Sequence, residues 1–286
     1  MSILDSIDIT TADFVDLFDE LPLWSAPFGL WMLDRVPLRP GQAILDVGAG
    51  TGFLSIELAE RCGRAATVHA VDPWGAATDR LRRKIAQRGL SNLVVLSQDA
   101  AVLPLPERSI DVIVSNLGVN NFDQPDTVLA ECARVARPGS CLLLTTNLVG
   151  HMAEFYDVYR QVLSSRGQAG SVARLDEHIA HRATPDSVSQ LLARTGFAVE
   201  EVTTGSFRLR FADGSALLNH FFIRMAFVPA WAALVEPGTA PAVFDALEAA
   251  LNDRAASRGE LALTIPTAGF VARRVSCPAG QPAPCR

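Results

Sequence analysis

From Gln42 onward, short apolar runs alternate with amphipathic stretches of helical period. This alternation is typical of the crossover units that build a parallel sheet. The apolar runs predict five strands, at Ala43–Val47, Thr67–Val71, Leu93–Leu96, Ile110–Ser115 and Cys141–Thr146. The stretches between them predict helices near Phe53–Cys62, Ala76–Arg88 and Pro125–Ala136. The pattern therefore predicts an α/β fold.

The spacing of apolar residues changes after residue 146. Three stretches predict helices, at Met152–Ser165, Pro185–Arg194 and Ser215–Phe227, and a polar segment separates the first two. Phe197–Phe211 predicts one long strand or two short ones, and a last strand is expected within Leu261–Val275. Together these elements predict a Rossmann-like, seven-stranded, mostly parallel sheet with helices on both faces, plus a helical cap.

The same patterns divide the chain into four parts. Residues 1–40 are rich in aromatic residues, lie outside the sheet pattern and predict an N-terminal helical cap. Residues 41–146 are expected to form the ligand-binding core, and residues 147–275 to complete the sheet and carry cap and substrate-binding insertions. Residues 276–286 contain little to bury and predict a flexible tail.

The charge and cysteine content narrow the class of protein. Twenty-five Lys and Arg against 31 Asp and Glu give a net charge of −6, which argues against a nucleic-acid partner. A basic cluster within residues 80–88 is interpreted as a solvated helix face. The five cysteines form no metal-binding spacing, so we expect reduced thiols and no metal site. No signal peptide and no apolar run of about 18 residues is present, so a soluble, cytoplasmic monomer or homodimer is expected.

A glycine-rich turn follows the first predicted strand. Residues 46–52 read Asp-Val-Gly-Ala-Gly-Thr-Gly and join that strand to the first helix, where ligands bind in sheets of this kind. The glycines allow close backbone approach, and the N–H groups of the helix start face the ligand. Asp46 stands before the first glycine and is expected to meet a ligand ammonium.

Two further carboxylates follow the next strands in register. Asp72 ends the second strand and is placed to accept both hydroxyls of a ribose. Asp99 follows the third strand and is placed to accept from the exocyclic amine of adenine. An NAD-dependent oxidoreductase would share the turn and Asp72, but it would require Gly-x-Gly-x-x-Gly, whereas this chain has Gly-x-Gly-x-Gly.

These motifs make the chain similar to the class I S-adenosylmethionine-dependent methyltransferases, of the methyltransferase type 11 and ubiquinone/menaquinone methyltransferase kind. The resemblance covers about residues 40 to 146. It includes the acid-x-Gly-x-Gly-x-Gly motif at 46–52, the acid Asp72, Asp99-Ala100 with the following Leu-Pro-Leu-Pro, the fourth strand, and the Arg134–Gly139 turn. Residues 117–122 resemble the Phe-Gly-x-Arg-Asn stretch of the quinone enzymes, but Asn120 replaces the arginine and argues against a quinone acceptor.

The resemblance implies S-adenosylmethionine as cofactor and assigns contacts to it. Gly48 and Gly50 would lie near the methionine part, Asp72 would hold the ribose, and Asn116 would meet the ammonium through its backbone carbonyl. Pro73 and Trp74 would flank the adenine, and Ala100 would donate its N–H to the ring. The implied binding set is Asp46, Gly48, Ala49, Gly50, Gly52, Asp72, Pro73, Trp74, Asp99, Ala100 and Asn116.

The methyl acceptor is expected to be a small, apolar or aromatic molecule, because the segments outside the core are rich in aromatic residues. His151, His220, and Tyr156 or Tyr159 are the candidate general bases, and the sequence does not choose among them. Two alternatives stay open: a catalytically inactive cofactor-binding protein, and an enzyme of other chemistry on the same fold.

Overall fold

The computed structural model describes residues 3–4, 8–20 and 23–275. The predicted tail, with Cys277 and Cys285, lies outside these residues. The chain divides into two compact units, each built from separated segments. The core unit comprises Thr10–Thr146, Pro185–Thr203 and Ala268–Arg286, and the insert unit comprises Met1–Ile9, Asn147–Thr184 and Thr204–Thr267.

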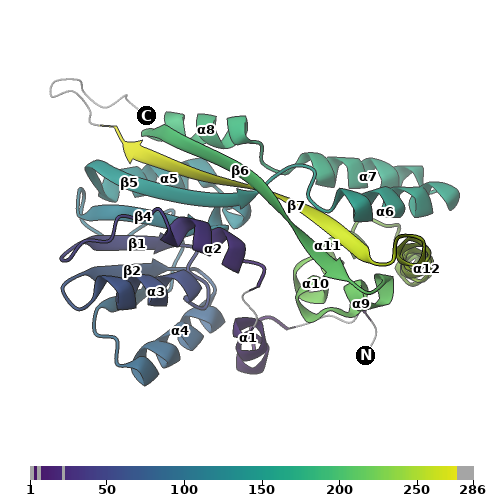
Figure 1. The fold of residues 1–286 in the computed structure, drawn as a ribbon, viewed down its shortest axis with the longest axis horizontal. Coiled ribbons are helices and arrows are strands. Elements are labelled where there is room, and N and C mark those ends of the chain that lie inside the picture. Colours follow the sequence, from purple (N-terminus) through teal and green to yellow (C-terminus); the bar gives the residue numbers. More distant parts are fainter. Residues whose placement is uncertain (1–2, 5–7, 21–22, 276–286) are drawn as a thin grey trace. The chain divides into compact units, whose positions relative to one another are not determined.

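A seven-stranded sheet has the order β3-β2-β1-β4-β5-β7-β6, with mostly parallel strands (Figure 1), and β6 and β7 each have residues in both units. Its strands are β1 (Ala43–Val47), β2 (Thr67–Val71), β3 (Leu93–Leu96), β4 (Ile110–Asn116), β5 (Ala136–Asn147), β6 (Phe197–Phe211) and β7 (Leu261–Arg274). The neighbouring pairs among β1 to β5 are parallel. The predicted fold is confirmed, and the first three strands have the predicted bounds.

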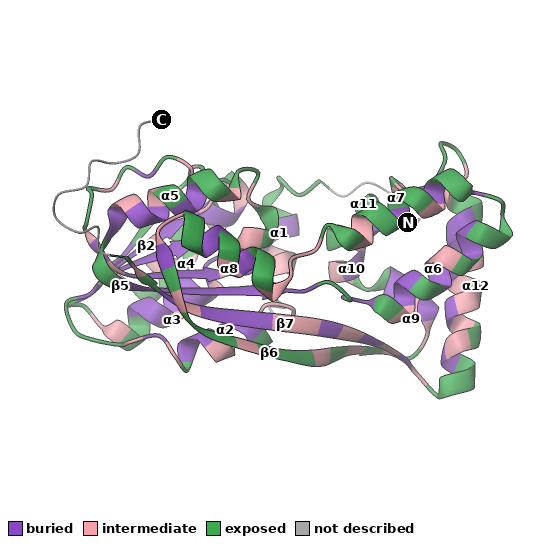
Figure 2. Cartoon of the chain, turned by 90° about the horizontal axis from the view of Figure 1, so that it is seen from above, coloured by how far each residue is buried: buried purple, intermediate pink, exposed green. Residues whose placement is uncertain are grey.

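The α-helices described in the core unit are α1 (Ala12–Asp19), α2 (Ala26–Leu33), α3 (Phe53–Cys62), α4 (Gly75–Arg88), α5 (Pro125–Val135) and α8 (Pro185–Arg194). Helix α3 packs on β2, α4 on β3 and α2 on β4. Apolar side chains such as Ile44, Leu58, Val68 and Leu81 are fully buried there. The central strands are correspondingly buried along most of their length (Figure 2).

The insert unit is mainly helical. Its helices are α6 (Ala153–Ser165), α7 (Ala169–Ala180), α9 (Gly214–Asn219), α10 (Phe221–Ala226), α11 (Val228–Ala232) and α12 (Ala240–Arg258). Large aromatic side chains fill its interior, where Phe155, Tyr159, Trp231 and Phe244 are buried. The Phe155 and Trp231 rings stack with centroids 4.0 Å apart. This unit therefore has an aromatic core of its own.

The structure differs from the sequence pattern at three places in the insert unit. The polar segment after α6 forms α7, and the sequence pattern gave no sign of α12. The single helix predicted at Ser215–Phe227 is broken, because His220 takes an extended conformation (φ −63°, ψ 127°) between α9 and α10. Helix α7 buries only Ser171 and Leu175, so it presents too narrow an apolar stripe to be recognised.

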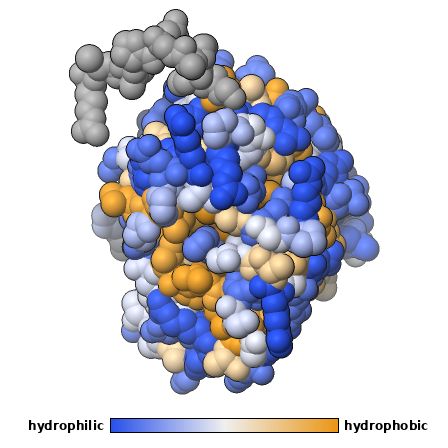
Figure 3. Space-filling model, turned by 90° about the vertical axis from the view of Figure 1, so that its left-hand side faces the viewer, coloured by the Kyte–Doolittle hydropathy of each residue, from blue (hydrophilic) through white to orange (hydrophobic). Residues whose placement is uncertain are grey.

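Within the described part of the chain, no helix is long and apolar enough to cross a membrane. Its three cysteines, Cys62, Cys132 and Cys141, are free thiols. The face in Figure 3 is mostly hydrophilic, with one apolar band across its middle. Scattered apolar surface is ordinary for folded proteins, so this face by itself identifies no partner.

Candidate functional site

The glycine-rich turn between β1 and α3 has a backbone that favours glycine at three positions. Gly48, Gly50 and Gly52 have φ of +77°, +54° and +86°, in the left-handed region. The Gly48 and Ala49 N–H groups both donate to the Val71 carbonyl at the end of β2, at 2.9 and 3.1 Å. The turn is therefore fixed to two adjacent strand ends.

The three glycines differ in what surrounds them. A Cβ on Gly48 would lie 2.9 Å from the Gly118 Cα, and one on Gly52 would lie 2.2 Å from the Leu81 side chain. A Cβ on Gly50 would meet no atom within 4 Å. The turn is thus packed on two sides and open above Gly50.

Asp72 links β2 to this turn. Its Oδ2 accepts from the Gly50 N–H and its Oδ1 from the Trp74 N–H, both at 2.8 Å. Burial raises the pKa of Asp72, and these two hydrogen bonds act in the opposite direction. Each carboxylate oxygen keeps a further lone pair for a ligand hydroxyl.

Asp46 lies beneath the turn. The residue is 1% exposed, and its Oδ2 accepts from the Ser55 hydroxyl of α3 at 2.5 Å. Burial raises the pKa of Asp46 to about 7, and the Ser55 hydrogen bond opposes the rise. The structure thus gives this carboxylate a protein partner, Ser55, and its expected contact with an ammonium stays a prediction.

Trp74 is covered by α1. The Phe18 ring meets the Trp74 ring edge-on with centroids 5.4 Å apart, and Phe14 lies at 6.3 Å. These phenylalanines are four residues apart and so share one helix face. They were missed as contacts of the site because the sequence does not show which surface that face covers. Pro73, beside Trp74, is exposed.

Helix α1 is held to α4 by ion pairs. Asp19 accepts from Lys84 at 2.6 Å and from Arg80 at 2.9 Å, and Asp16 accepts from Arg83 at 2.7 Å. The interpretation of the basic cluster as a solvated face holds for Arg82, Arg83 and Arg88, which are exposed, but Arg80 and Lys84 are partly buried by their ion pairs with α1. Burial raises the pKa of Asp19, but hydrogen bonds from Lys84, Thr51 and Arg80 leave it lowered overall. Thr51 belongs to the glycine-rich turn, so α1 reaches the turn as well.

Asn116, at the end of β4, is fixed through its side chain. Its Nδ2 donates to the Ser25 carbonyl at 3.2 Å, and its Oδ1 accepts from the Thr145 hydroxyl at 2.9 Å. The next residue, Leu117, has φ +66°, which is strained for a branched side chain. This strained turn brings Gly118 against Gly48.

Asp99 and Ala100 follow β3. Asp99 is exposed and its Oδ1 accepts from the Ala101 N–H at 2.8 Å, whereas Ala100 is buried. The core unit thus carries every residue of the predicted binding set.

The four candidate bases lie in the insert unit. His151 is 2% exposed, and burial, then Arg182 and His178, lower its pKa to about 3. Tyr156 lies beside it, with ring centroids 6.4 Å apart, and its hydroxyl accepts from Trp231 Nε1 at 3.3 Å. Tyr159 donates to the Trp231 carbonyl at 2.8 Å. His220 is exposed and meets the Phe211 ring edge-on at 5.5 Å.

Comparison with known proteins assigns the family. Residues 44–139 match the model of a methyltransferase domain. The ubiquinone/menaquinone biosynthesis C-methyltransferase UbiE of Shewanella oneidensis is 31% identical over 175 residues, which are 58% of this chain and 70% of that protein. The chain belongs to the class I S-adenosylmethionine-dependent methyltransferases.

Solved structures share the fold of this methyltransferase. A putative methyltransferase from Bacillus halodurans superposes with a TM-score of 0.59 at 18% identity, over 87% of this chain and 99% of that one. A geranyl diphosphate methyltransferase, solved with GPP and sinefungin, gives 0.53 at 16% identity, over 87% and 77%. At these identities the likeness concerns the fold.

The turn of this methyltransferase fits the cofactor of its family. S-Adenosylmethionine needs close backbone approach and an acceptor for its ribose hydroxyls. The space above Gly50 provides the first, and Asp72, anchored by two N–H groups, provides the second. The residues present therefore suit the group.

The close packing around Gly118 can be tested by substitution. We expect Gly118→Ala to destabilise the methyltransferase by about 1–3 kcal/mol, because its Cβ would lie 2.7 Å from the Val47 carbonyl oxygen. Gly75→Ala is the matched control, since its Cβ would meet no atom within 4 Å and we expect a gain of up to about 1 kcal/mol. Urea unfolding measures both, and equal stabilities for the two variants would contradict the close packing.

Proposed function

We propose that this methyltransferase acts on a small, apolar or aromatic acceptor. The observation that carries the proposal is the aromatic interior of the insert unit, where the His151 and Tyr156 rings lie close to Phe227 and Trp231. Small-molecule sites are lined mainly by such side chains. The name of one similar protein, in ubiquinone/menaquinone biosynthesis, agrees with an apolar acceptor.

A quinone acceptor is disfavoured within this proposal. Asn120 stands where the similar quinone enzymes have arginine, and its Oδ1 accepts from the Thr146 hydroxyl. An arginine has no acceptor atom and cannot make this contact. The two side chains are therefore not equivalent in chemistry, and we place the acceptor outside the quinones.

For the cofactor we propose the contacts predicted from sequence. Asp72 holds the ribose hydroxyls, Asn116 offers its backbone carbonyl to the ammonium, and Asp99 with Ala100 binds the adenine base. The remaining residues, Asp46, Gly48, Ala49, Gly50, Gly52, Pro73 and Trp74, shape the space around it. The bound cofactor supplies a methyl group already activated on a sulfonium. The chain then has to align the acceptor and exclude water, and alignment of this kind contributes about 7–11 kcal/mol.

A general base is needed if the acceptor is a hydroxyl or an acidic carbon. We propose that it is one of His151, Tyr156 and His220, with Tyr159 as a fourth candidate. Burial lowers the pKa of His151 to about 3, so its imidazole is neutral at physiological pH but is a weak base. Loss of the true base is expected to lower kcat by about 10²–10⁴-fold. The variants His151→Asn, Tyr156→Phe, Tyr159→Phe and His220→Asn, compared at equal cofactor saturation, identify it.

The partners and setting are proposed from composition. A net charge of −6 is unfavourable for a polyanionic substrate, so we propose a free small molecule rather than nucleic acid. We further propose a cytoplasmic protein that is a monomer or a homodimer. Sedimentation velocity distinguishes the two assemblies.

The decisive experiment is an acceptor screen with labelled methyl donor. We expect label in apolar or aromatic small molecules, and transfer only to polar acceptors such as amino acids would refute the proposed class. Calorimetry provides the parallel test of the binding contacts. We expect S-adenosylmethionine and S-adenosylhomocysteine to bind in the micromolar range and NAD to give no heat.

A further inference from the structure

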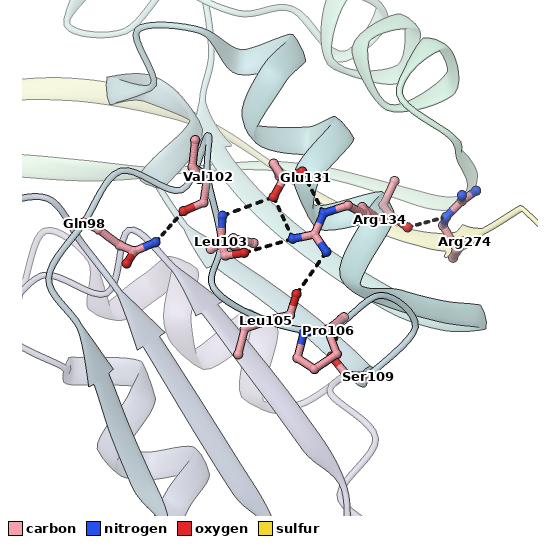
Figure 4. Close-up of polar contacts among 10 residues, drawn as sticks. Gln98, Val102, Leu103, Leu105, Pro106, Ser109, Glu131, Arg134 and Arg274 are labelled. Atoms are coloured by element: carbon pink, nitrogen blue, oxygen red, sulfur yellow. Dashed lines mark hydrogen bonds and ion pairs between the residues drawn. The ribbon is translucent and has the colours of Figure 1, made fainter. Parts of the chain in front are cut away.

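The loop between β3 and β4 is tied to the end of α5. Arg134 Nη1 donates to the Leu105 carbonyl and Nη2 to the Leu103 carbonyl, both at 2.9 Å. Glu131 Oε2 accepts from the Leu103 N–H at 3.1 Å. Figure 4 shows the two side chains reaching from one helix to this loop. Two successive turns of α5 thus hold both the N–H and the C=O of Leu103.

Arginine is the residue type that this arrangement requires. The Arg134 guanidinium also donates to Glu131, from Nε at 2.8 Å and from Nη2 at 2.8 Å. One planar group therefore binds a carboxylate on one edge and two carbonyls on the others. A lysine ammonium keeps the charge but cannot span these acceptors in a fixed plane. The hydrogen bond from Arg134 also lowers the pKa of Glu131, which keeps the carboxylate ionised.

Leu103, which Arg134 and Glu131 hold by hydrogen bonds, lies three residues after Ala100, one of the proposed adenine contacts. Ala100 and Leu103 are both buried, at 6% and 4% exposure. The segment between them is a tight turn, in which the Val102 N–H donates to the Asp99 carbonyl and the Ala101 N–H to the Asp99 carboxylate. Because this turn is short and closed by its own hydrogen bonds, a shift at Leu103 is passed to Ala100.

We propose that Arg134 and Glu131 are positioning residues that hold Asp99 and Ala100 in register for the adenine base, and so set the base specificity of cofactor binding. The inference rests on the adenine contacts given under the proposed function. Neither side chain needs to touch the cofactor. Their effect is on where the loop places an acceptor for the adenine amine and a donor for the ring.

The test compares two ligands that differ only in the base. S-Adenosylhomocysteine carries the adenine amine, and S-inosylhomocysteine carries a carbonyl in its place, which opposes the Asp99 carboxylate. Calorimetry gives the ratio of their dissociation constants for each protein. We expect wild type to prefer the adenine ligand, and Arg134→Lys to reduce that preference by about fivefold or more, since a hydrogen bond to a charged group loses most of its strength when misaligned.

Arg274→Lys is the matched control. Arg274 Nε donates to the Ala133 carbonyl at 2.7 Å, at the same end of α5, and its Nη1 donates to the Gly196 and Val275 carbonyls, away from residues 99–105. We expect this variant to lower the melting temperature and to leave the base preference unchanged. A purely structural role for Arg134 would give the same pattern as the control.

The outcomes separate the inference from the function on which it rests. A wild-type protein without base preference overturns the adenine contacts and the inference with them. A wild type that prefers adenine, with Arg134→Lys folded and equally selective, overturns the inference alone. If Arg134→Lys does not fold, Glu131→Gln decides in its place: it keeps the side-chain volume, and an unchanged preference in that variant overturns the inference.

Discussion

Replacing Asp72 with alanine is expected to weaken binding of S-adenosylhomocysteine at least about tenfold, because each hydrogen bond to a charged acceptor contributes about 1.5–3 kcal/mol. The Asp72 carboxylate holds the Gly50 and Trp74 N–H groups at 2.8 Å and is proposed to accept the ribose hydroxyls as well. Alanine leaves the two N–H groups and the ligand without an acceptor. Titration calorimetry measures the dissociation constant.

Asp79→Ala is the control for charge. Asp79 lies on α4, the helix that begins directly after Trp74. Its side chain is 73% exposed and forms an ion pair with Arg82. Exposed pairs of this kind contribute at most about 1 kcal/mol to stability, so cofactor affinity should not change. A folded Asp72→Ala protein with the affinity of wild type would show that Asp72 supports the turn and does not hold the ribose.

The second large expected effect is that Asp46 makes the unfolding free energy depend on pH. Its pKa is raised from 3.8 to about 7 in the folded protein. The folded state therefore binds more protons than the unfolded state between these two pH values, and protonation of Asp46 stabilises the fold. This contribution to the unfolding free energy is complete below pH 3.8 and is lost as pH rises through 7. The loss amounts to about 4 kcal/mol at 1.36 kcal/mol per pKa unit.

Asp46→Asn removes that titration while keeping the side-chain shape. We expect the unfolding free energy of the variant, minus that of wild type, to increase from pH 4 to pH 7.5 by an amount of this order. Urea unfolding of both proteins at each pH gives the difference, in which titrating groups that do not interact with Asp46 cancel. Asp72, whose charge also raises the pKa of Asp46, contributes to the difference. A difference that is constant over this range would mean that Asp46 ionises normally in the folded protein.

Local patterns were sufficient for the first half of the sheet. β1, β2, β3 and α3 have the predicted bounds, because each apolar run has strand or helix length and is followed by glycine or polar residues. β5 begins at Ala136, five residues before its predicted start, because Pro138 and Gly139 are typical of the exit from a helix and not of a strand. The strand tolerates both residues where they are exposed, before its buried part.

The second half was harder to predict because its helices do not have simple patterns. Helix α12 begins with Pro241 near its first turn and spreads alanine over all sides, so no single stripe marks its buried face at Val243, Leu247 and Leu251. No glycine or proline at His220 marks the break between α9 and α10 in the sequence. Propensity is a weak guide where tertiary contacts decide.

For the site, sequence was informative where the relevant residues are neighbours in the chain. Gly48, Gly50 and Gly52 stand in one turn, and the left-handed backbone found at each explains why glycine is required there. The contacts of Trp74 with Phe18 and of Gly48 with Gly118 join residues far apart in the sequence. A single sequence carries no record of such pairs, so only the fold reveals them.

The strand order has a consequence for how the chain is made. β7 lies between β5 and β6 in the sheet, although it is the last of the described strands to be synthesised. While the ribosome is still adding residues before Leu261, β5 presents an open edge and β6 has no strand beside it. Exposed edges of this kind pair readily with other chains. Nascent chains that stall between Phe211 and Leu261 are thus the species most exposed to aggregation and most in need of a chaperone.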